Sequence, residues 1–497
     1  MSEFEPARNT KNIVLAVVVI AIIAVGGIGG YLLFSNPTTT TTSTGTTTGT
    51  TTQTTTAPSI TLVILTRHDV AIHSVFESAF LKTDIAKQYG ITDIDWKTPS
   101  AEYWDDLINA GTVDVCWGGG PTIFDQLMRD GYLQPLTSDK MATAAARVND
   151  SLAGADMKRY DSNGDLIWIA AAISSFGFTV NHAFLDDYSL PVPHKWTDLA
   201  NATYGSLLPA IPTIAMGNAP DTTSNTRIYE IITQGLGWET GWATLARMAG
   251  SAKIYLGSVE TQSAAENGEV GISMSIDFYG YVTQSKNPDC EYIIPEGQTI
   301  VNGDPIAISA TAPHPEAAEA FLDWVLTPEA QSLWLNDNIL RMPVMREAFD
   351  QPLGQSHPQM YATFNKTVKT VGIDFNDTLS LEINAAFVKY FESVFTDAHT
   401  ELVQCWDVIV DAYLDGKLNQ SQFEYYANLM GQPVTIQDPK TGLDEQFTIE
   451  YARAINHDMI YDATYASQVQ SRWTAAAKAH YNDVKSQVEA LLLALSI

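Results

Sequence analysis

Two short polar stretches of the chain carry side chains suited to binding an anionic group. The first is Thr66, Arg67, His68 and Asp69, and the second is Thr223, Ser224, Asn225 and Thr226. The first stretch follows an apolar run, and its arginine offers a forked pair of donors that fits a carboxylate or a phosphate. The second begins a predicted helix, where hydroxyl and backbone N–H groups favour an anion. A surface salt bridge and ordinary helix capping use the same residues, so both interpretations stay open.

A glycine-rich turn at residues 113–125 is a third candidate site. It combines a short β-branched strand, three glycines and a helix with Pro121 in its first turn. The candidate binding residues are Trp117, Gly118, Gly119 and Gly120. The tryptophan offers a flat apolar wall and the glycines offer backbone donors, although a plain tight turn needs the same glycines. The pattern matches neither G-x-G-x-x-G nor the lysine-bearing phosphate loop, so we predict no nucleotide site.

Three further polar residues are candidates for ligand binding. Asp277, Tyr279 and Tyr281 follow an apolar strand expected at residues 270–276. If that strand continues, Tyr279 and Tyr281 face the same side and can stack on a sugar or close over another organic solute.

Known catalytic and metal-binding patterns are absent from the sequence. The chain contains neither H-E-x-x-H nor G-x-S-x-G. Cys116, Cys290 and Cys405 lack metal-ligand spacing, and we expect free buried thiols. The acidic turn at residues 161–165 fails as a calcium loop because its twelfth position is Ala172. We therefore expect no enzyme activity, no metal and no cofactor, although abundant carboxylates leave an extracellular hydrolase as an alternative.

The length and the net charge of the chain limit its possible architectures and its possible partners. The 497 residues suffice for two or three lobes, and a hydrophobic content of 45% provides ample core. With 27 basic and 57 acidic residues, the net charge of −30 argues against nucleic acid as a partner.

The N-terminus predicts a membrane anchor. Residues 13–34 form an uncharged apolar run long enough for a membrane-spanning helix. Arg8 and Lys11 precede the run, which places residues 1–12 in the cytoplasm. Residues 35–58 are threonine-rich, so we expect a stalk and a glycoprotein. The prediction is a single-pass protein of the cell membrane whose bulk is extracellular; processing just before the apolar run, as in pilin-like archaeal precursors, stays an alternative.

The elements that would position the candidate residues alternate between strands and helices. We expect strands at residues 60–65 and 94–97, a helix at residues 103–109, and then the strand, turn and helix of residues 113–125. This β-α-β-α-β-α order predicts an α/β fold with a mostly parallel sheet and helices on its faces. A second α/β unit is expected over residues 211–276.

The chain after residue 345 is expected to be mainly helical. Apolar residues at three- and four-residue steps predict helices at residues 383–395 and 402–414. A turn signal predicts a hairpin over residues 434–449, and a final helix is expected from about residue 473. The apolar tail of that helix is too short to span a membrane, so we expect it to pack on the body of the protein.

Several of these segments together resemble extracellular solute-binding proteins of ABC importers. VDVCWGGGPTIFDQLMRDGYLQPL, residues 113–136, resembles a strand–turn–helix of their type 2 periplasmic-binding-protein fold, and more narrowly of its iron(III)-type branch. In family order follow SSFGFTVN at 174–181, PHKWTDLAN at 193–201 and EAAEAFLDWVLTPEAQ at 316–331. The first of these lies in a strand-like stretch at residues 166–180, and the resemblance implies that Ser174 and Ser175 are small polar contacts of the ligand. The resemblance covers residues 60–344, and the N-terminus resembles an archaeal-type anchored form.

The resemblance implies two α/β lobes joined by a hinge, with a small solute between them and an ABC permease as partner. The implied divisions are residues 59–172 for the first lobe, 173–304 for the second, and 305–497 for a return to the first lobe with a helical C-terminal extension. Iron binders of this branch use adjacent tyrosines, whereas Gly280 separates Tyr279 from Tyr281, so an organic solute is favoured over ferric iron. A structural surface or filament protein that polymerises through its N-terminal helix remains a second alternative.

Overall fold

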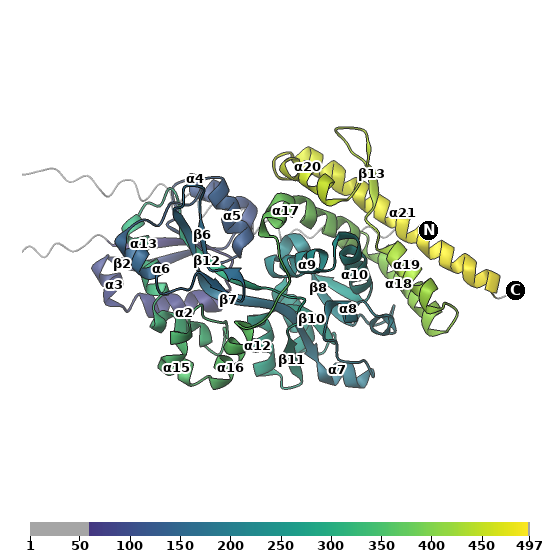
Figure 1. Cartoon of the computed structure of the whole chain (residues 1–497), viewed down its shortest axis with the longest axis horizontal. Helices are drawn as coiled ribbons and strands as arrows, with labels where there is room; N and C mark the ends of the chain where they lie inside the picture. Colours follow the sequence, from purple (N-terminus) through teal and green to yellow (C-terminus); the bar gives the residue numbers. More distant parts are fainter. Residues whose placement is uncertain (1–58, 496–497) are drawn as a thin grey trace, which may run out of the picture. The chain divides into compact units, whose positions relative to one another are not determined.

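One sheet of ten strands is the framework of the described chain (Figure 1). The computed structural model describes residues 59–495. The predicted membrane-spanning run at residues 13–34 and the stalk at residues 35–58 lie outside the described residues. Among residues 59–495, no helix is long and apolar enough to cross a membrane.

The first lobe contains three parallel strands in the order β2-β1-β3. Its main elements are β1 (Ile60–Thr66), α2 (Val70–Phe80), α3 (Asp84–Gln88), β2 (Ile91–Lys97), α4 (Trp104–Asn109), β3 (Val115–Trp117), α5 (Pro121–Arg129), α6 (Asp139–Ala145) and α13 (Pro315–Val325). The predicted alternation of strands and helices is confirmed. Leu62, Ile64 and Leu65 of β1 are all fully buried, as expected for a parallel strand with helices over both faces.

The second lobe repeats this arrangement, with parallel strands in the order β10-β8-β9. Its main elements are α7 (His182–Asp187), α8 (Trp196–Leu199), β8 (Ile214–Gly217), α9 (Thr223–Gly235), α10 (Trp238–Gly250), β9 (Ala252–Tyr255), α11 (Ser258–Glu266), β10 (Ile272–Ile276), α12 (Asp277–Lys286) and β11 (Cys290–Ile293). The second α/β unit expected over residues 211–276 is therefore present.

Two long strands carry the chain between the lobes. In β7 (Leu166–Asn181), the first half pairs with β12 (Val301–Ile308) and the second half with β10 and β11, all antiparallel. β6 (Lys158–Tyr160) also pairs with β7 antiparallel, and β12 pairs with β3 antiparallel. The prediction of a mostly parallel sheet is thus wrong at its centre, because a chain that passes from one lobe to the other and returns must run there in opposite directions. The predicted lobe divisions at residues 173 and 304 fall inside these two strands.

The chain after Met345 divides between the two lobes. Phe349, Met360 and Phe364, in and around α15 (Pro352–Gln355) and α16 (Pro358–Thr367), join the core of the first lobe. The later elements are α17 (Asp377–Phe391), α18 (His399–Leu414), α19 (Gln420–Met430), β13 (Thr435–Gln437), β14 (Asp444–Gln446), α20 (Ile449–Tyr461) and α21 (Ala463–Leu495). We call residues 377–495 the C-terminal extension. The predicted hairpin is confirmed as the antiparallel pair of β13 and β14, and the final helix begins earlier than expected.

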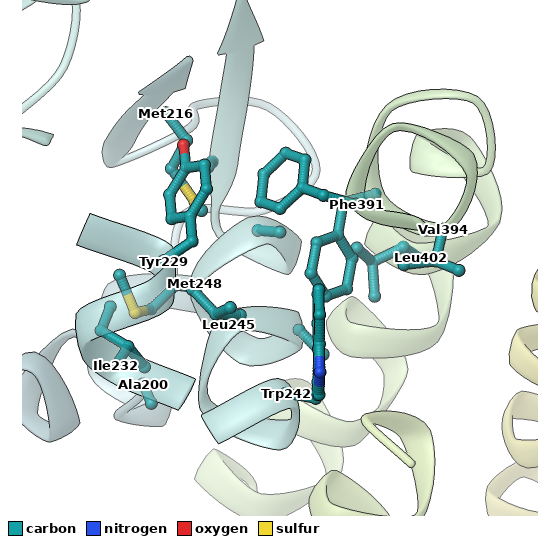
Figure 2. Close-up of a cluster of buried hydrophobic side chains, with 14 of the residues drawn as sticks. Ala200, Met216, Tyr229, Ile232, Trp242, Leu245, Met248, Phe391, Val394 and Leu402 are labelled. Carbon is teal, nitrogen blue, oxygen red and sulfur yellow. The ribbon is translucent and has the colours of Figure 1, made fainter. Parts of the chain in front are cut away.

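The C-terminal extension shares one hydrophobic core with the second lobe, and not with the first lobe as expected. Figure 2 shows Trp242 and Leu245 of α10 beside Phe391 and Leu402 of the extension. Tyr229 of α9 stacks on Phe391 with ring centroids 4.3 Å apart. The apolar face of a predicted helix shows that it will be buried, but not against which neighbour, so periodicity could not decide this docking. The three cysteines are free and buried, as predicted.

Trp242 should dominate the stability of this shared core. Its indole is 1% exposed and lies 4.9 Å, centroid to centroid, from the rings of both Phe387 and Tyr390. We expect Trp242→Ala to lower the free energy of unfolding by about 3–5 kcal/mol, because it removes a large buried side chain and leaves a cavity. Urea titration followed by circular dichroism measures this loss. Tyr425→Ala, at a position 59% exposed, is the control and should change stability by less than about 0.5 kcal/mol; an equal effect of both would contradict the shared core.

Candidate ligand-binding cleft

A cavity of about 630 Å³ lies between the two lobes. This volume is in the range of about 300–1,000 Å³ that is usual for small-molecule sites. Its floor is formed by Ser174 of β7, by Asn302 and Asp304 of β12, and by Arg341. Both crossing strands therefore contribute to the cavity at the place where they pass between the lobes.

Five helices begin at the wall of the cavity. These are α2 and α5 from the first lobe and α9, α11 and α12 from the second. Asp69 caps α2 by accepting from the Ala71 N–H, and Thr222 caps α9 by accepting from the Asn225 N–H. At α5 and α11, no described side chain caps the first turn, whereas at α12 the Phe278 N–H donates to Oδ1 of Asp277 at 2.8 Å. The first-turn N–H groups of α5 and α11 are therefore available to a ligand, and the positive ends of the helix dipoles favour a negative charge.

A buried ionic cluster supports the floor of the cavity. Oδ2 of Asp304 lies 2.7 Å from Nε2 of His68 and 3.1 Å from Nη2 of Arg341. The Gly119 N–H donates to Oδ1 of the same carboxylate at 3.3 Å. Arg341 also donates to Oγ of Ser174 at 2.9 Å, which links the cluster to β7.

The environment sets the charges of this cluster. Burial tends to raise the pKa of Asp304, but Arg341 and His68 outweigh burial, so the pKa is lowered and the carboxylate is ionised. Burial lowers the pKa of His68, so its imidazole is neutral and its Nε2–H donates to Asp304. The cluster is thus one anion neutralised by one cation, Arg341, with a neutral donor beside it.

The glycine-rich turn makes room for this cluster. Gly118, Gly119 and Gly120 all have positive φ, at 78°, 112° and 89°. A Cβ atom on Gly118 would lie 2.1 Å from Nε2 of His68, so only glycine lets the imidazole reach Asp304. Gly119 donates to the carboxylate, and Gly120 precedes the first turn of α5. The turn therefore has both predicted roles, as a tight turn and as part of the cavity wall.

The structure brings ten of the seventeen predicted binding residues to the cavity. Those that line it are Arg67, His68, Asp69, Gly119, Gly120, Ser174, Thr223, Ser224, Thr226 and Tyr279. The residues that do not line it are Thr66, Trp117, Gly118, Ser175, Asn225, Asp277 and Tyr281. Several of the latter group support the wall from behind: Trp117 packs edge-on against the His68 ring at 4.9 Å, and Ser175 donates to Asp277 from its N–H and its hydroxyl.

The predicted pairing of Tyr279 with Tyr281 on one strand face is wrong. Residues from Asp277 onward form helix α12, in which positions two apart point in different directions. Tyr279 lines the cavity, whereas Tyr281 is 8% exposed and packs against Tyr292, with ring centroids 5.1 Å apart. An apolar strand ending in Asp277 could equally be followed by a helix, and the acidic first-turn residue was the signal for one.

Sequence reasoning missed Arg341, Asp304, Asn302 and Phe278, which also line the cavity. Arg341 stands between Leu340 and Met342, and Asp304 lies within the otherwise uncharged strand β12. A lone charge inside an apolar stretch signals a buried ion pair, because an isolated buried charge is unfavourable. The sequence contains both signals but not the pairing, since the two residues meet only through the fold.

The two lobes, the crossing strands and the cleft define a solute-binding protein. A sequence profile of the bacterial extracellular solute-binding proteins matches residues 111–370, more than half of the chain, and the chain belongs to that family. It is also similar to the phosphoglycerate transport regulatory protein PgtC of Salmonella typhimurium, at 25% identity over 267 residues. That similarity covers 53% of this chain and 61% of PgtC.

Solved structures share the fold. An ABC transporter structure from Clostridium perfringens superposes with a TM-score of 0.50 at 19% identity, covering 67% of this chain and 99% of that one. The periplasmic binding protein AfuA of Actinobacillus pleuropneumoniae, solved with fructose-6-phosphate, gives a TM-score of 0.49 at 15% identity, covering 62% and 98%. The first of these comparisons supports the mixed α/β fold of type 2 periplasmic binding proteins.

Asp277, behind the cavity wall, predicts a pH dependence of stability. Burial raises the pKa of its carboxyl to about 7, although Ser175 donates to it. An unfolded aspartate has a pKa of about 3.9, so the proton kept by the folded state stabilises the fold at low pH, and this contribution is lost as the pH rises from about 4 to about 7. Asp277→Asn cannot titrate, so its free energy of unfolding should rise relative to the native protein across this window.

Urea titrations at several pH values between these limits measure that difference. Asp187→Asn, at an exposed position of the same lobe, is the matched control and should leave the pH dependence of the native protein unchanged. A difference between Asp277→Asn and the native protein that stays constant with pH would contradict the assignment.

Proposed function

We propose that the protein is the membrane-anchored, extracellular solute-binding component of an ABC importer and that it captures an organic anion between its two lobes. The N-terminal apolar run would anchor it, and the threonine-rich stalk would hold the binding lobes away from the membrane. The solute would be passed to an ABC permease, and no chemical turnover would take place.

The observation that carries this proposal is the convergence of positive groups on one cavity. Helices α5 and α11 begin at the cavity without a side-chain cap among the described residues, and Arg67 lines the same space. Asp304 is neutralised by Arg341, and Asp69 is used in capping α2. The inner end of the cavity therefore suits a carboxylate or phosphate group that accepts from several donors at once.

The crossing strands support a hinge mechanism. β7 and β12 join the lobes close to Ser174 and Asn302, which both line the cavity. Small φ and ψ changes near these residues would move one lobe against the other. A solute that contacts both lobes would then stabilise the closed arrangement in proportion to its better binding there.

The curated relative supports the solute class. The name of PgtC refers to phosphoglycerate transport, and phosphoglycerate carries both a phosphate and a carboxylate. Ferric iron is less well supported, because only Tyr279 of the two candidate tyrosines lines the cavity. In the described part of the chain, no group of three or more His, Cys, Asp and Glu side chains is placed to hold a metal ion.

Arg67 tests the anionic class of solute. We expect Arg67→Ala to weaken binding of 3-phosphoglycerate by roughly 2 kcal/mol, about thirty-fold, because a charge-assisted pair is lost. Titration calorimetry on the detergent-solubilised full chain measures the change. Arg129→Ala, an exposed arginine at the end of α5 that does not line the cavity, is the control and should leave the affinity unchanged.

Mass spectrometry of small molecules that co-purify with the protein, together with metal analysis, identifies the solute directly. Equal affinity of Arg67→Ala and the native protein would overturn the role of Arg67. Reproducible hydrolysis of a co-purified or added compound would overturn capture without turnover and favour the extracellular hydrolase.

A further inference from the structure

We propose that the C-terminal extension supplies an outer, apolar subsite of the solute cavity, and that the solute is an organic anion with an apolar portion long enough to reach it. This rests on the proposed function, in which the inner end of the cavity takes the anionic group. The proposal adds a second half to the recognition site and assigns it to residues after Asp377.

Helix α17 presents one of its faces to the cavity. The residues of α17 that line it are Leu381, Asn384, Ala385, Val388 and Lys389. They recur at steps of three and four, so they lie on one side of the helix. On the other side, Ile383, Phe387 and Tyr390 are buried in the core shared with the second lobe. The wall is therefore a rigid face of a packed helix and not a loop.

Helix α5 of the first lobe packs beside α17 and lines the cavity next to it. Its lining residues Ile123, Gln126 and Leu127 recur with the same helical spacing, and Asp130 follows at the end of the helix. Ile123 and Leu127 of α5 and Leu381, Ala385 and Val388 of α17 give the outer cavity an apolar strip, with the polar side chains of Gln126, Asp130, Asn384 and Lys389 beside it. Such a strip takes hydrocarbon better than water, because removing apolar surface from water is favourable.

The end of helix α20 borders the mouth of the same cavity. Met459, Ile460 and Tyr461 line it there. Ile460 is 46% exposed and Tyr461 is 61% exposed. Large apolar side chains that remain exposed beside a cavity offer contact area to a bound molecule.

The wall contacts both lobes. Asp377, in the first turn of α17, forms an ion pair with Arg227 of α9 in the second lobe. Its other carboxylate oxygen lies 3.7 Å from Nη2 of Arg159 on β6 in the first lobe. Gln234 of α9 donates to Oγ of Ser380 at 3.1 Å. These contacts place the cavity-lining face of α17 beside α5.

This wall is additional to the part of the chain that matches the family. The family profile ends at residue 370, before α17 begins. The Clostridium perfringens structure is covered over 99% of its length by only 67% of this chain. The outer subsite is therefore a feature that this chain adds to the common two-lobe fold, and it extends the range of solutes beyond a compact anion.

A series of alkyl anions tests the subsite. The probes are inorganic phosphate and ethyl, butyl and hexyl phosphate, with propanoate, pentanoate and heptanoate as the matching carboxylates, titrated into the detergent-solubilised full chain. For the preferred head group, affinity should rise by up to roughly four-fold for each methylene that enters the apolar cavity. Partition of a probe into detergent is the same for every variant, so the difference in affinity between variants reports the contribution of the cavity alone.

Two variants of α17 act on the subsite in different ways. Val388→Asn makes the wall polar, and Ala385→Trp fills the space. Both variants should remove most of the rise in affinity that accompanies a longer alkyl chain of the probe. Their affinity for inorganic phosphate, or for propanoate if carboxylates are preferred, should stay within two-fold of that of the native protein. Leu414→Asn, at an exposed position of the extension that does not line the cavity, is the matched control and should keep the native gain.

The outcomes separate the two proposals. Binding of the short anions with no gain for longer chains, or a gain that survives in both α17 variants, would overturn the outer subsite and leave the proposed function intact. No binding of any phosphate or carboxylate to the native protein would overturn the anionic class itself, and the outer subsite with it.

Discussion

The ionised carboxylate of Asp304 is the constraint on which the cleft depends. It lies on β12, and its partners are His68 after β1, Gly119 after β3, and Arg341 from a later part of the chain. Removing a carboxylate from water costs several kcal/mol, so it remains charged only while these partners surround it. Four separate segments are thereby held around the inner end of the cavity, with the helix starts of α2 and α5 beside them.

The crossing strands and the C-terminal extension both lie around the floor of the cavity. β7 and β12 carry the chain between the lobes, so the floor lies where the two lobes meet. The extension shares its core with the second lobe, whereas the cavity-lining helix α17 also packs beside α5 of the first lobe. Relative motion of the lobes would therefore change the space between α17 and α5 together with the space at the floor.

Much of the local structure could be predicted from the sequence, because it depends on nearby residues. Apolar runs beside helical periodicity predicted the two α/β units, and a turn signal predicted the hairpin of β13 and β14. The helix at residues 277–286 was misassigned because an apolar strand does not show where it ends. In the cleft, Arg67 could be found because it is a polar residue just after an apolar strand, whereas Ser174, inside β7, was found through the family resemblance.

The sequence by itself determined most of the strands and helices, since these elements arise from backbone geometry and from residues a few positions apart. Only the tertiary structure decided that Arg341 neutralises Asp304, that Tyr281 packs away from the cavity, and that α17 docks on the second lobe. The physical reason is that ion pairing and hydrophobic burial are favourable with any compatible partner that the fold brings close. The sequence shows that a charged or apolar side chain needs a partner when it is buried. The chain topology determines which side chain becomes that partner.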